Sequence, residues 1–296
     1  MQIMLQVFTL FLLMMCGFYA RKTRMMGDEA FTGLNRLVLY FAQPALILSS
    51  MQQSASPELI RDLAFVLVLA CAVMILSGLA ALRLFRHESA PRRSVLTSMS
   101  MVSNCGFMGF PLIIAALGEE ALIYAVIYVA AFQLICWTLG AYVFGGRRAM
   151  RPGELFKNPS LLAVLGGLVL FLTGWRLPGF VNDGLSMMGS VTTPVAMFVI
   201  GSNLVGLKPS HLSDRPMLAA CALRLIAAPL AVLLLRLTPL SSQVVNSLYL
   251  CTAMPCAALT AMMAELYQAD SVLASRGVAV STALSMVTVP LLLSLI

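Results

Sequence analysis

Long apolar runs, separated by short polar stretches, make up most of this chain. Each run has the length of about 20 residues that an α-helix needs to cross the hydrocarbon core of a bilayer. The pattern predicts ten membrane-spanning helices, at residues 3–20, 30–51, 62–84, 94–117, 120–144, 159–175, 183–206, 215–236, 242–266 and 271–295. No basic region precedes the first run and no small-residue cleavage site ends it, so we expect a retained helix rather than a signal peptide.

The longest polar stretch between the runs, residues 145–160 (GGRRAMRPGELFKNPS), divides the predicted spans into two groups of five. Because five is odd, the second group enters the membrane from the opposite side. If the two groups are related, they form an inverted repeat. We therefore predict an all-α membrane protein of two five-helix repeats, at residues 1–150 and 151–296.

Prolines support this division. Pro44 and Pro194, in the second and seventh spans, lie 150 residues apart. Pro111 and Pro255, in the fourth and ninth spans, lie 144 residues apart. Both offsets are close to half the chain length, as an internal repeat requires.

The fourth and ninth predicted spans hold helix breakers and small polar side chains in mid-membrane, where free backbone groups need protein or a water-filled cavity to satisfy them. Breaks at matching positions of inverted halves are typical of a transporter binding site, and the N-termini of half-helices suit an anion. Ordinary proline kinks, and an interhelical hydrogen bond from Asn104, are the alternative interpretations. The candidate substrate-binding residues in these spans are Asn104, Gly106, Gly109, Pro111, Thr252 and Pro255.

Composition agrees with a membrane protein, because 60% of the residues are hydrophobic and only 10% are charged. The formal net charge of +7 has an uneven distribution. Three basic residues adjoin the loops after even-numbered spans (Arg61, Arg176 and Arg236), and fourteen adjoin the loops after odd-numbered spans: Arg21, Lys22, Arg24, Arg83, Arg86, Arg92, Arg93, Arg147, Arg148, Arg151, Lys157, Lys208, Arg215 and Arg276. Since cytoplasmic loops are enriched in Lys and Arg, we expect the loops after odd-numbered spans to lie in the cytoplasm. Both termini would then lie on the outer side of the cell inner membrane. The basic charge then reflects topology, and no nucleic-acid partner is expected.

Little in the sequence indicates chemistry on a substrate. The seven cysteines all fall within predicted spans, and the two histidines lie in loops, so we expect neither a disulfide nor a metal site, cofactor or enzyme activity. No acidic residue lies at the centre of a span, where a proton relay would stand. Arg36 and Arg224 lie within spans, and we expect both to extend towards the interface, which leaves no cation at the midplane.

Several segments resemble the auxin efflux carrier family of membrane transporters in its bacterial form, and the resemblance extends over all ten spans. It is carried by NCGFMGFPL in the fourth span, NPSLLAVLGGL at the start of the sixth, TTPVAMFVIGSNL in the seventh, and AMPCAALTAMMAELYQADSVLASRGVAVSTALSMVTVP. The resemblance implies secondary transport of small organic carboxylates: auxin in plants, and malate- or malonate-like acids in bacterial relatives. It places the crossing prolines of the family on Pro111 and Pro255, and its substrate-binding asparagine on Asn104.

The resemblance also implies an architecture. Spans 1, 2, 6 and 7 form a scaffold, which is often the surface of a homodimer, and spans 3–5 and 8–10 form a moving transport unit. Bends at Pro44 and Pro194 would bring Gln43, Thr192 and Thr193 towards the site, although ordinary interhelical hydrogen bonding explains these side chains equally well. A sodium- or proton-coupled organic-anion symporter of the bile-acid transporter type is the alternative function.

Overall fold

The computed structural model describes residues 2–147, 153 and 158–296, and every regular element in this part of the chain is helical. The predicted all-α membrane class is confirmed. Within the described residues, six helices are long and apolar enough to cross a membrane: Leu5–Lys22, Pro57–Leu84, Glu119–Gly145, Gly179–Gly206, Arg215–Leu237 and Ser271–Leu293. Cys105–Leu117 and Pro159–Thr173 are shorter apolar helices. The full ten-span inverted topology stays a prediction.

Many of the predicted spans are built from several consecutive elements, where α denotes an α-helix and η a π- or 3₁₀-helix. The first half contains α1 (Gln2–Lys22), α2 (Asp28–Leu37), η1 (Val38–Ala42), α3 (Gln43–Ser50), α4 (Pro57–Leu84), α5 (Ala90–Met101), η2 (Cys105–Gly109), α6 (Phe110–Leu117), η3 (Glu119–Ala121), α7 (Leu122–Ile135), η4 (Cys136–Gly140) and α8 (Ala141–Gly145). The second half contains α9 (Pro159–Thr173), α10 (Gly179–Ser190), α11 (Thr192–Ser202), η7 (Asn203–Gly206), η8 (Pro209–Ser213), α12 (Arg215–Ala222), η9 (Leu223–Ala227), α13 (Ala228–Leu233), η10 (Leu234–Leu237), α14 (Ser242–Ala253), α15 (Leu259–Leu266) and α16 (Ser271–Leu293).

Short polar side chains fix the beginnings of five helices. In each case a side-chain oxygen accepts a hydrogen bond from a backbone N–H of the first turn, which would otherwise have no partner. These N-caps stand before α4, α9, α12, α14 and α16, and they are Ser56, Asn158, Asp214, Ser241 and Asp270.

Three prolines lie within helices that continue past them. The π-turns η1, η2 and η9 each end two residues before a proline, at Pro44, Pro111 and Pro229. A proline lacks the N–H of its position, and its ring crowds the carbonyl one turn earlier. Widening that turn relieves the crowding, so the helix continues past the proline.

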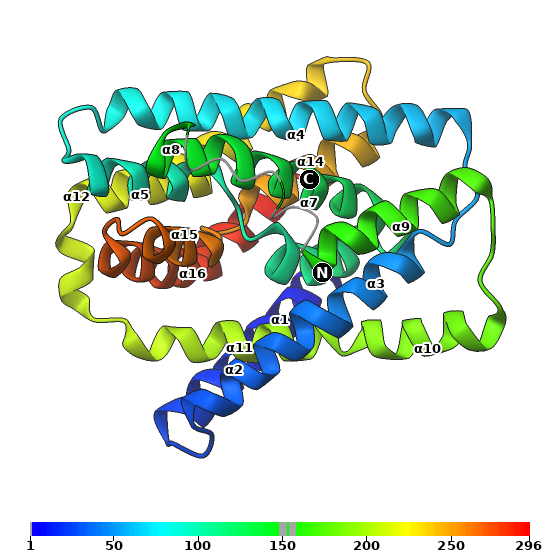
Figure 1. Ribbon diagram of the computed structural model, residues 1–296, viewed down its shortest axis with the longest axis horizontal. Coiled ribbons are helices and arrows are strands. Elements are labelled where there is room, and N and C mark those ends of the chain that lie inside the picture. Colours follow the sequence, from blue (N-terminus) through cyan, green and yellow to red (C-terminus); the bar gives the residue numbers. More distant parts are fainter. Residues whose placement is uncertain (1, 148–152, 154–157) are drawn as a thin grey trace.

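The densest packing falls within two groups of helices. In one group α1 packs on α11, and α3 packs on α9 and α10 (Figure 1). In the other, α4 packs on α5 and α7, α13 on α14, and α15 on α16. At the α1–α11 contact, Gly17 faces the backbone of Phe198 and Gly201 faces the backbone of Met14, so closely that neither glycine has room for a Cβ. Small residues are what allow membrane helices to approach in this way.

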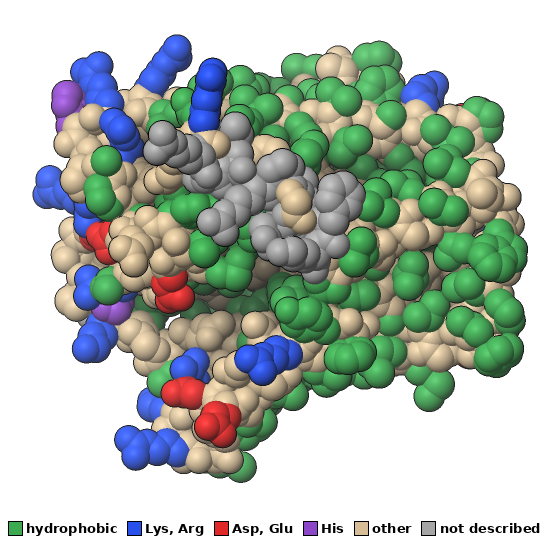
Figure 2. All heavy atoms as spheres, viewed as in Figure 1, with side chains coloured by type: hydrophobic (Ala, Val, Ile, Leu, Met, Phe, Trp, Pro, Cys, Tyr) green, Lys and Arg blue, Asp and Glu red, His purple; other side chains and the backbone are tan. Residues whose placement is uncertain are grey.

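Charge and apolar surface are separated on the outside. Figure 2 shows Lys and Arg side chains gathered at the left end of the molecule, where α5, α12 and α15 lie in Figure 1, and hydrophobic side chains dominating the right-hand part. We call the end that contains α5, α12 and α15 the basic end. Large apolar side chains such as Leu76, Leu172 and Leu291 are more than half exposed, as expected of a surface that faces lipid. Three basic residues counted in the sequence, Arg148, Arg151 and Lys157, lie outside the described residues.

Candidate functional site

Two interrupted helices cross in the interior of the protein. The first is broken between the end of α5 at Met101 and the start of η2 at Cys105, and the second between the end of α14 at Ala253 and the start of α15 at Leu259. Pro255 lies in its break, as expected. Pro111 does not, because it lies near the start of α6, beyond the break. The expectation that Pro111 marks the interruption is therefore wrong, and the π-turn before it explains why the helix continues there.

The two breaks satisfy each other's backbone groups. The Asn104 N–H donates to the Pro255 carbonyl at 2.7 Å, and the Ala257 N–H donates to the Val102 carbonyl at 3.3 Å. Ser103 and Cys256 face each other as an isolated antiparallel bridge. A buried polar backbone group without a partner is costly, and more so in a membrane. Extended backbone can persist here because each segment supplies the partners that the other lacks.

Arg224 on η9 supports the same crossing from the side. Its guanidinium donates to the carbonyls of Ser100, at 3.4 Å, and Met101, at 3.1 Å, at the end of α5, and to the carbonyl of Thr252 at the end of α14. The side chain is fully buried, with 0% exposure. The expectation that Arg224 extends to the interface, and that the midplane holds no cation, is therefore wrong. The guanidinium binds the last carbonyls of two helices more favourably than it binds water at the interface, because these carbonyls are otherwise unpaired and carry partial negative charge. Arg36, in contrast, is exposed.

A cavity of about 290 Å³ lies on one side of the crossing. Residues of both breaks contribute to its wall, together with residues from α2, η1, α7, η4, α9, α11 and α16. It therefore lies between the two groups of helices described above. The apolar part of the wall includes the aromatic side chains of Phe107, Phe132 and Trp137.

The polar part of the cavity wall is made of amides and hydroxyls. Among the described residues that line it, none carries a charged side chain. The amides are Asn35, Gln43, Asn104, Gln133, Asn158 and Asn203, and the hydroxyls are Ser103, Ser160 and Thr282. Four buried atoms of this wall have no hydrogen-bond partner in the described structure: Ser103 Oγ, Gln133 Oε1, Trp137 Nε1 and Ser160 Oγ. Buried polar atoms are normally paired, so four unpaired ones around a single cavity indicate space for a polar ligand or water.

Gln43 approaches the first break closely. A Cβ placed on Gly106 would stand only 2.5 Å from Gln43 Nε2, so glycine is the residue that permits this contact. The Gln43 side chain is 3% exposed, and no hydrogen bond holds it among the described residues. Gln43, at the start of α3, thus brings an available amide to the N-terminal end of the half-helix that starts at Cys105.

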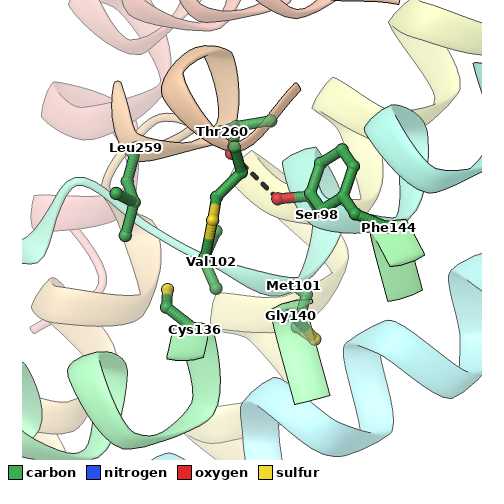
Figure 3. A pocket seen from close by; sticks show the side chains of 9 residues that line it. Ser98, Met101, Val102, Cys136, Gly140, Phe144, Leu259 and Thr260 are labelled. Atoms are coloured by element: carbon green, nitrogen blue, oxygen red, sulfur yellow. Dashed lines mark hydrogen bonds between the residues drawn. The ribbon is translucent and has the colours of Figure 1, made fainter. Parts of the chain in front are cut away.

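A second, much smaller cavity lies at the crossing, beside the α5–α15 contact. Its volume is about 10 Å³, and Figure 3 shows the side chains of Ser98 and Thr260 joined across it. The two hydroxyls are 3.0 Å apart and link α5 to α15. This space is at the lower limit for one water molecule, so it serves packing rather than the binding of a substrate.

Comparison with known proteins identifies the family. A family model described as a membrane transport protein matches residues 2–153 and 148–293. The chain belongs to the auxin efflux carrier family. The predicted resemblance is confirmed.

Relatives in this family are described as transporters. An uncharacterized transporter of Methanocaldococcus jannaschii is 27% identical over 96% of each chain. Another, from Methanothermobacter thermautotrophicus, is 29% identical over 96% of this chain and 95% of its own. The uncharacterized transporter YfdV of Escherichia coli K12 is 22% identical over 94% of this chain and 93% of its own. The family and these relatives make this chain a membrane transporter.

The residues that sequence reasoning selected in this family member fall into two sets. Gln43, Asn104 and Gly106 line the large cavity. The others do not. Gly109 packs beside Met254, and Thr252 is buried with its hydroxyl 3.2 Å from that of Tyr128. The remaining four are Pro111, Thr192, Thr193 and Pro255. Pro255, like Thr252, acts at the crossing through its backbone carbonyl.

Sequence reasoning missed several polar residues of the cavity. Gln133 and Thr282 lie within predicted spans, so an amide or hydroxyl in an apolar run was the signal that could have found them. Asn35, Asn158 and Asn203 lie near the ends of spans, where polar residues are common and carry no such signal.

Proposed function

We propose that this protein is a secondary transporter that moves small organic carboxylate anions across the inner membrane by alternating access. The observation that carries this proposal is the cavity at the crossing, because both half-helix N-termini open onto it. Cys105, Gly106 and Phe107 begin one half-helix, Ala258 and Leu259 begin the other, and all five line the cavity. The first N–H groups of a helix have no partner within it and carry partial positive charge, which suits a carboxylate.

Neutral amides complete this site without holding the cargo too tightly. Asn104, Gln43 and Gln133 offer N–H donors to a carboxylate, and the aromatic wall accommodates an apolar body. A hydrogen bond to a charged group contributes about 1.5–3 kcal/mol. A carrier must also release its cargo, which weaker neutral donors permit more readily than a fixed cation.

We further propose that the chain is built as two inverted repeats, with scaffold spans 1, 2, 6 and 7 and a transport unit of spans 3–5 and 8–10. The division of helix contacts into two groups supports this arrangement. Alternating access then follows from rocking of one group against the other around the cavity. We expect a homodimer in the bilayer, joined through the scaffold.

The orientation follows from the same observations. We propose that the basic end faces the cytoplasm and that both termini lie outside. Asn158 belongs to a loop that charge assigns to the cytoplasm, and Asn203 lies near the end of the seventh predicted span, which borders another such loop. Both residues line the cavity. On the other side α6 packs against α1, α11 and α14. These observations support the proposal that the cavity faces the cytoplasm in this state.

Transport by purified protein in proteoliposomes tests this function. The probes are a panel of radiolabelled mono- and dicarboxylates, each measured in counterflow without an imposed ion gradient. We expect saturable exchange of at least one carboxylate and no exchange of amines of similar size. Exchange should fall in Asn104→Ala and persist in Asn182→Ala, because Asn182 lies on α10 and is not part of the cavity wall. A correctly folded protein that exchanges no carboxylate contradicts the proposal, and repeating uptake with sodium or pH gradients tests for a symporter.

A further inference from the structure

Arg224 is a buried cation that pairs with no carboxylate among the described residues. In the part of the chain that the structure describes, its guanidinium hydrogen-bonds backbone carbonyls alone, and its Nε has no partner. A buried charge without compensation is costly, so something else must offset this one.

The ends of α5 and α14 provide that compensation. Both helices run into the crossing and stop there, and Arg224 binds the terminal carbonyls of each. A helix C-terminus carries roughly half a negative elementary charge. Two such ends therefore balance about one guanidinium.

The N-termini of the two half-helices at the crossing have no charged side chain beside them among the described residues that line the cavity. The half-helices that begin at Cys105 and at Leu259 present their N-termini to the large cavity, whose described lining carries no charged side chain. Unpaired buried oxygens of Ser103 and Gln133 lie in the same wall, which marks it as a site built for a ligand rather than a packing defect.

We propose that Arg224 is the positioning residue that sets the sign of the electrostatic potential in the cavity. By neutralising the carbonyl ends of α5 and α14, it leaves the positive ends of the other two half-helices uncompensated, and the cavity attracts anions. Arg224 achieves this without lining the cavity, so it does not hold the cargo and does not hinder its release. The inference deepens the proposed anion site and rests on it.

The potential can be measured without any substrate. Ala258 is exposed and lines the cavity at the start of α15, so Ala258→Cys places a thiol there. The two native cysteines that are not buried, Cys16 and Cys71, are replaced by serine, and protein without Ala258→Cys gives the background reaction. The thiol is modified with anionic 2-sulfonatoethyl methanethiosulfonate and cationic 2-(trimethylammonium)ethyl methanethiosulfonate. The ratio of the two rates, divided by the ratio for a free thiol in solution, reports the local potential.

We expect the anionic reagent to be favoured in the native background. Arg224→Gln keeps hydrogen-bond donors but removes the charge, and should lower the rate ratio by about tenfold, as expected for loss of one partly screened charge. Arg224→Lys keeps the charge and should stay within about twofold of native. The matched control is Arg236→Gln on η10, whose arginine binds the Leu295 carbonyl and Asn246 away from the crossing.

A folded Arg224→Gln protein with the native rate ratio overturns the inference and leaves Arg224 a structural link only. If Arg224→Gln does not fold, Arg224→His is measured at pH 8, where imidazole is neutral, and a native ratio there has the same meaning. These outcomes are independent of the transport assay, so failure of the proposed function and failure of this inference are distinguishable.

Discussion

The contact between Gly106 and Gln43 leads to a quantitative prediction. In Gly106→Ala, the new Cβ would stand 2.5 Å from Gln43 Nε2, which is well inside the distance that real Cβ atoms tolerate. The atom that must move is the far end of a flexible side chain, so we expect little loss of folding stability. The Gln43 amide, however, leaves its place beside the half-helix N-terminus. If it donates one hydrogen bond to a charged cargo, its loss weakens binding by about 1.5–3 kcal/mol, or roughly 10- to 150-fold in affinity.

A double-mutant cycle measures this effect. The affinity of the carboxylate selected by the counterflow panel is determined for native protein, Gly106→Ala, Gln43→Ala and the double variant. We expect the alanine at Gly106 to have almost no further effect once Gln43 is absent, because the displaced group is gone. Gly33→Ala is the matched control, since nothing lies within 4 Å of a Cβ at that position. Equal losses from Gly106→Ala with and without the Gln43 side chain would show that this reasoning is wrong.

Three other substitutions test the site, the topology and the crossing. Asn104→Ala should weaken carboxylate binding by about 1–3 kcal/mol. Asn104→Asp should bind the carboxylate less well than Asn104→Ala at neutral pH and recover binding at low pH, as the introduced carboxyl becomes protonated. Native-like binding by Asn104→Asp at neutral pH excludes this residue from the site. In a cysteine-free protein, Arg86→Cys should be protected from an impermeant thiol reagent added outside intact cells and Ser54→Cys should react, whereas external labelling of Arg86→Cys reverses the proposed orientation. Pro111→Ala should retain carboxylate counterflow, because the backbone hydrogen bonds that join the two breaks do not involve Pro111; complete loss of counterflow in a folded variant would contradict this.

Local pattern was enough to predict the class of this protein and where its unusual residues lie. Apolar runs of bilayer length predicted a helical membrane protein, since hydropathy and length are properties of each segment alone. Breakers and amides within those runs directed attention to Asn104, Gly106 and Pro255, all of which lie at or beside the crossing. Gln43 was suggested by the family resemblance rather than by pattern, and the structure places it in the cavity wall.

Sequence pattern failed where the answer depended on a partner from elsewhere in the chain. It placed a break at Pro111, because a proline removes a hydrogen bond locally, but a widened turn restores the helix there. The real break is stable because the segment around Pro255, some 150 residues away, supplies the missing backbone partners.

Arg224 shows most clearly the difference between what local sequence predicts and what distant segments decide. From sequence, an arginine two turns inside an apolar run is expected to reach for the interface, since water is the only partner that the segment itself can offer. Tertiary structure brings the carbonyl ends of α5 and α14 to the guanidinium, and these ends compensate a charge that no residue of its own helix could. The sequence by itself determined that this is a helical membrane protein and which two of its apolar segments are broken. Only the tertiary structure decided where the breaks lie, because the free energy of a broken or charged group in a membrane depends on the partners that distant segments bring to it.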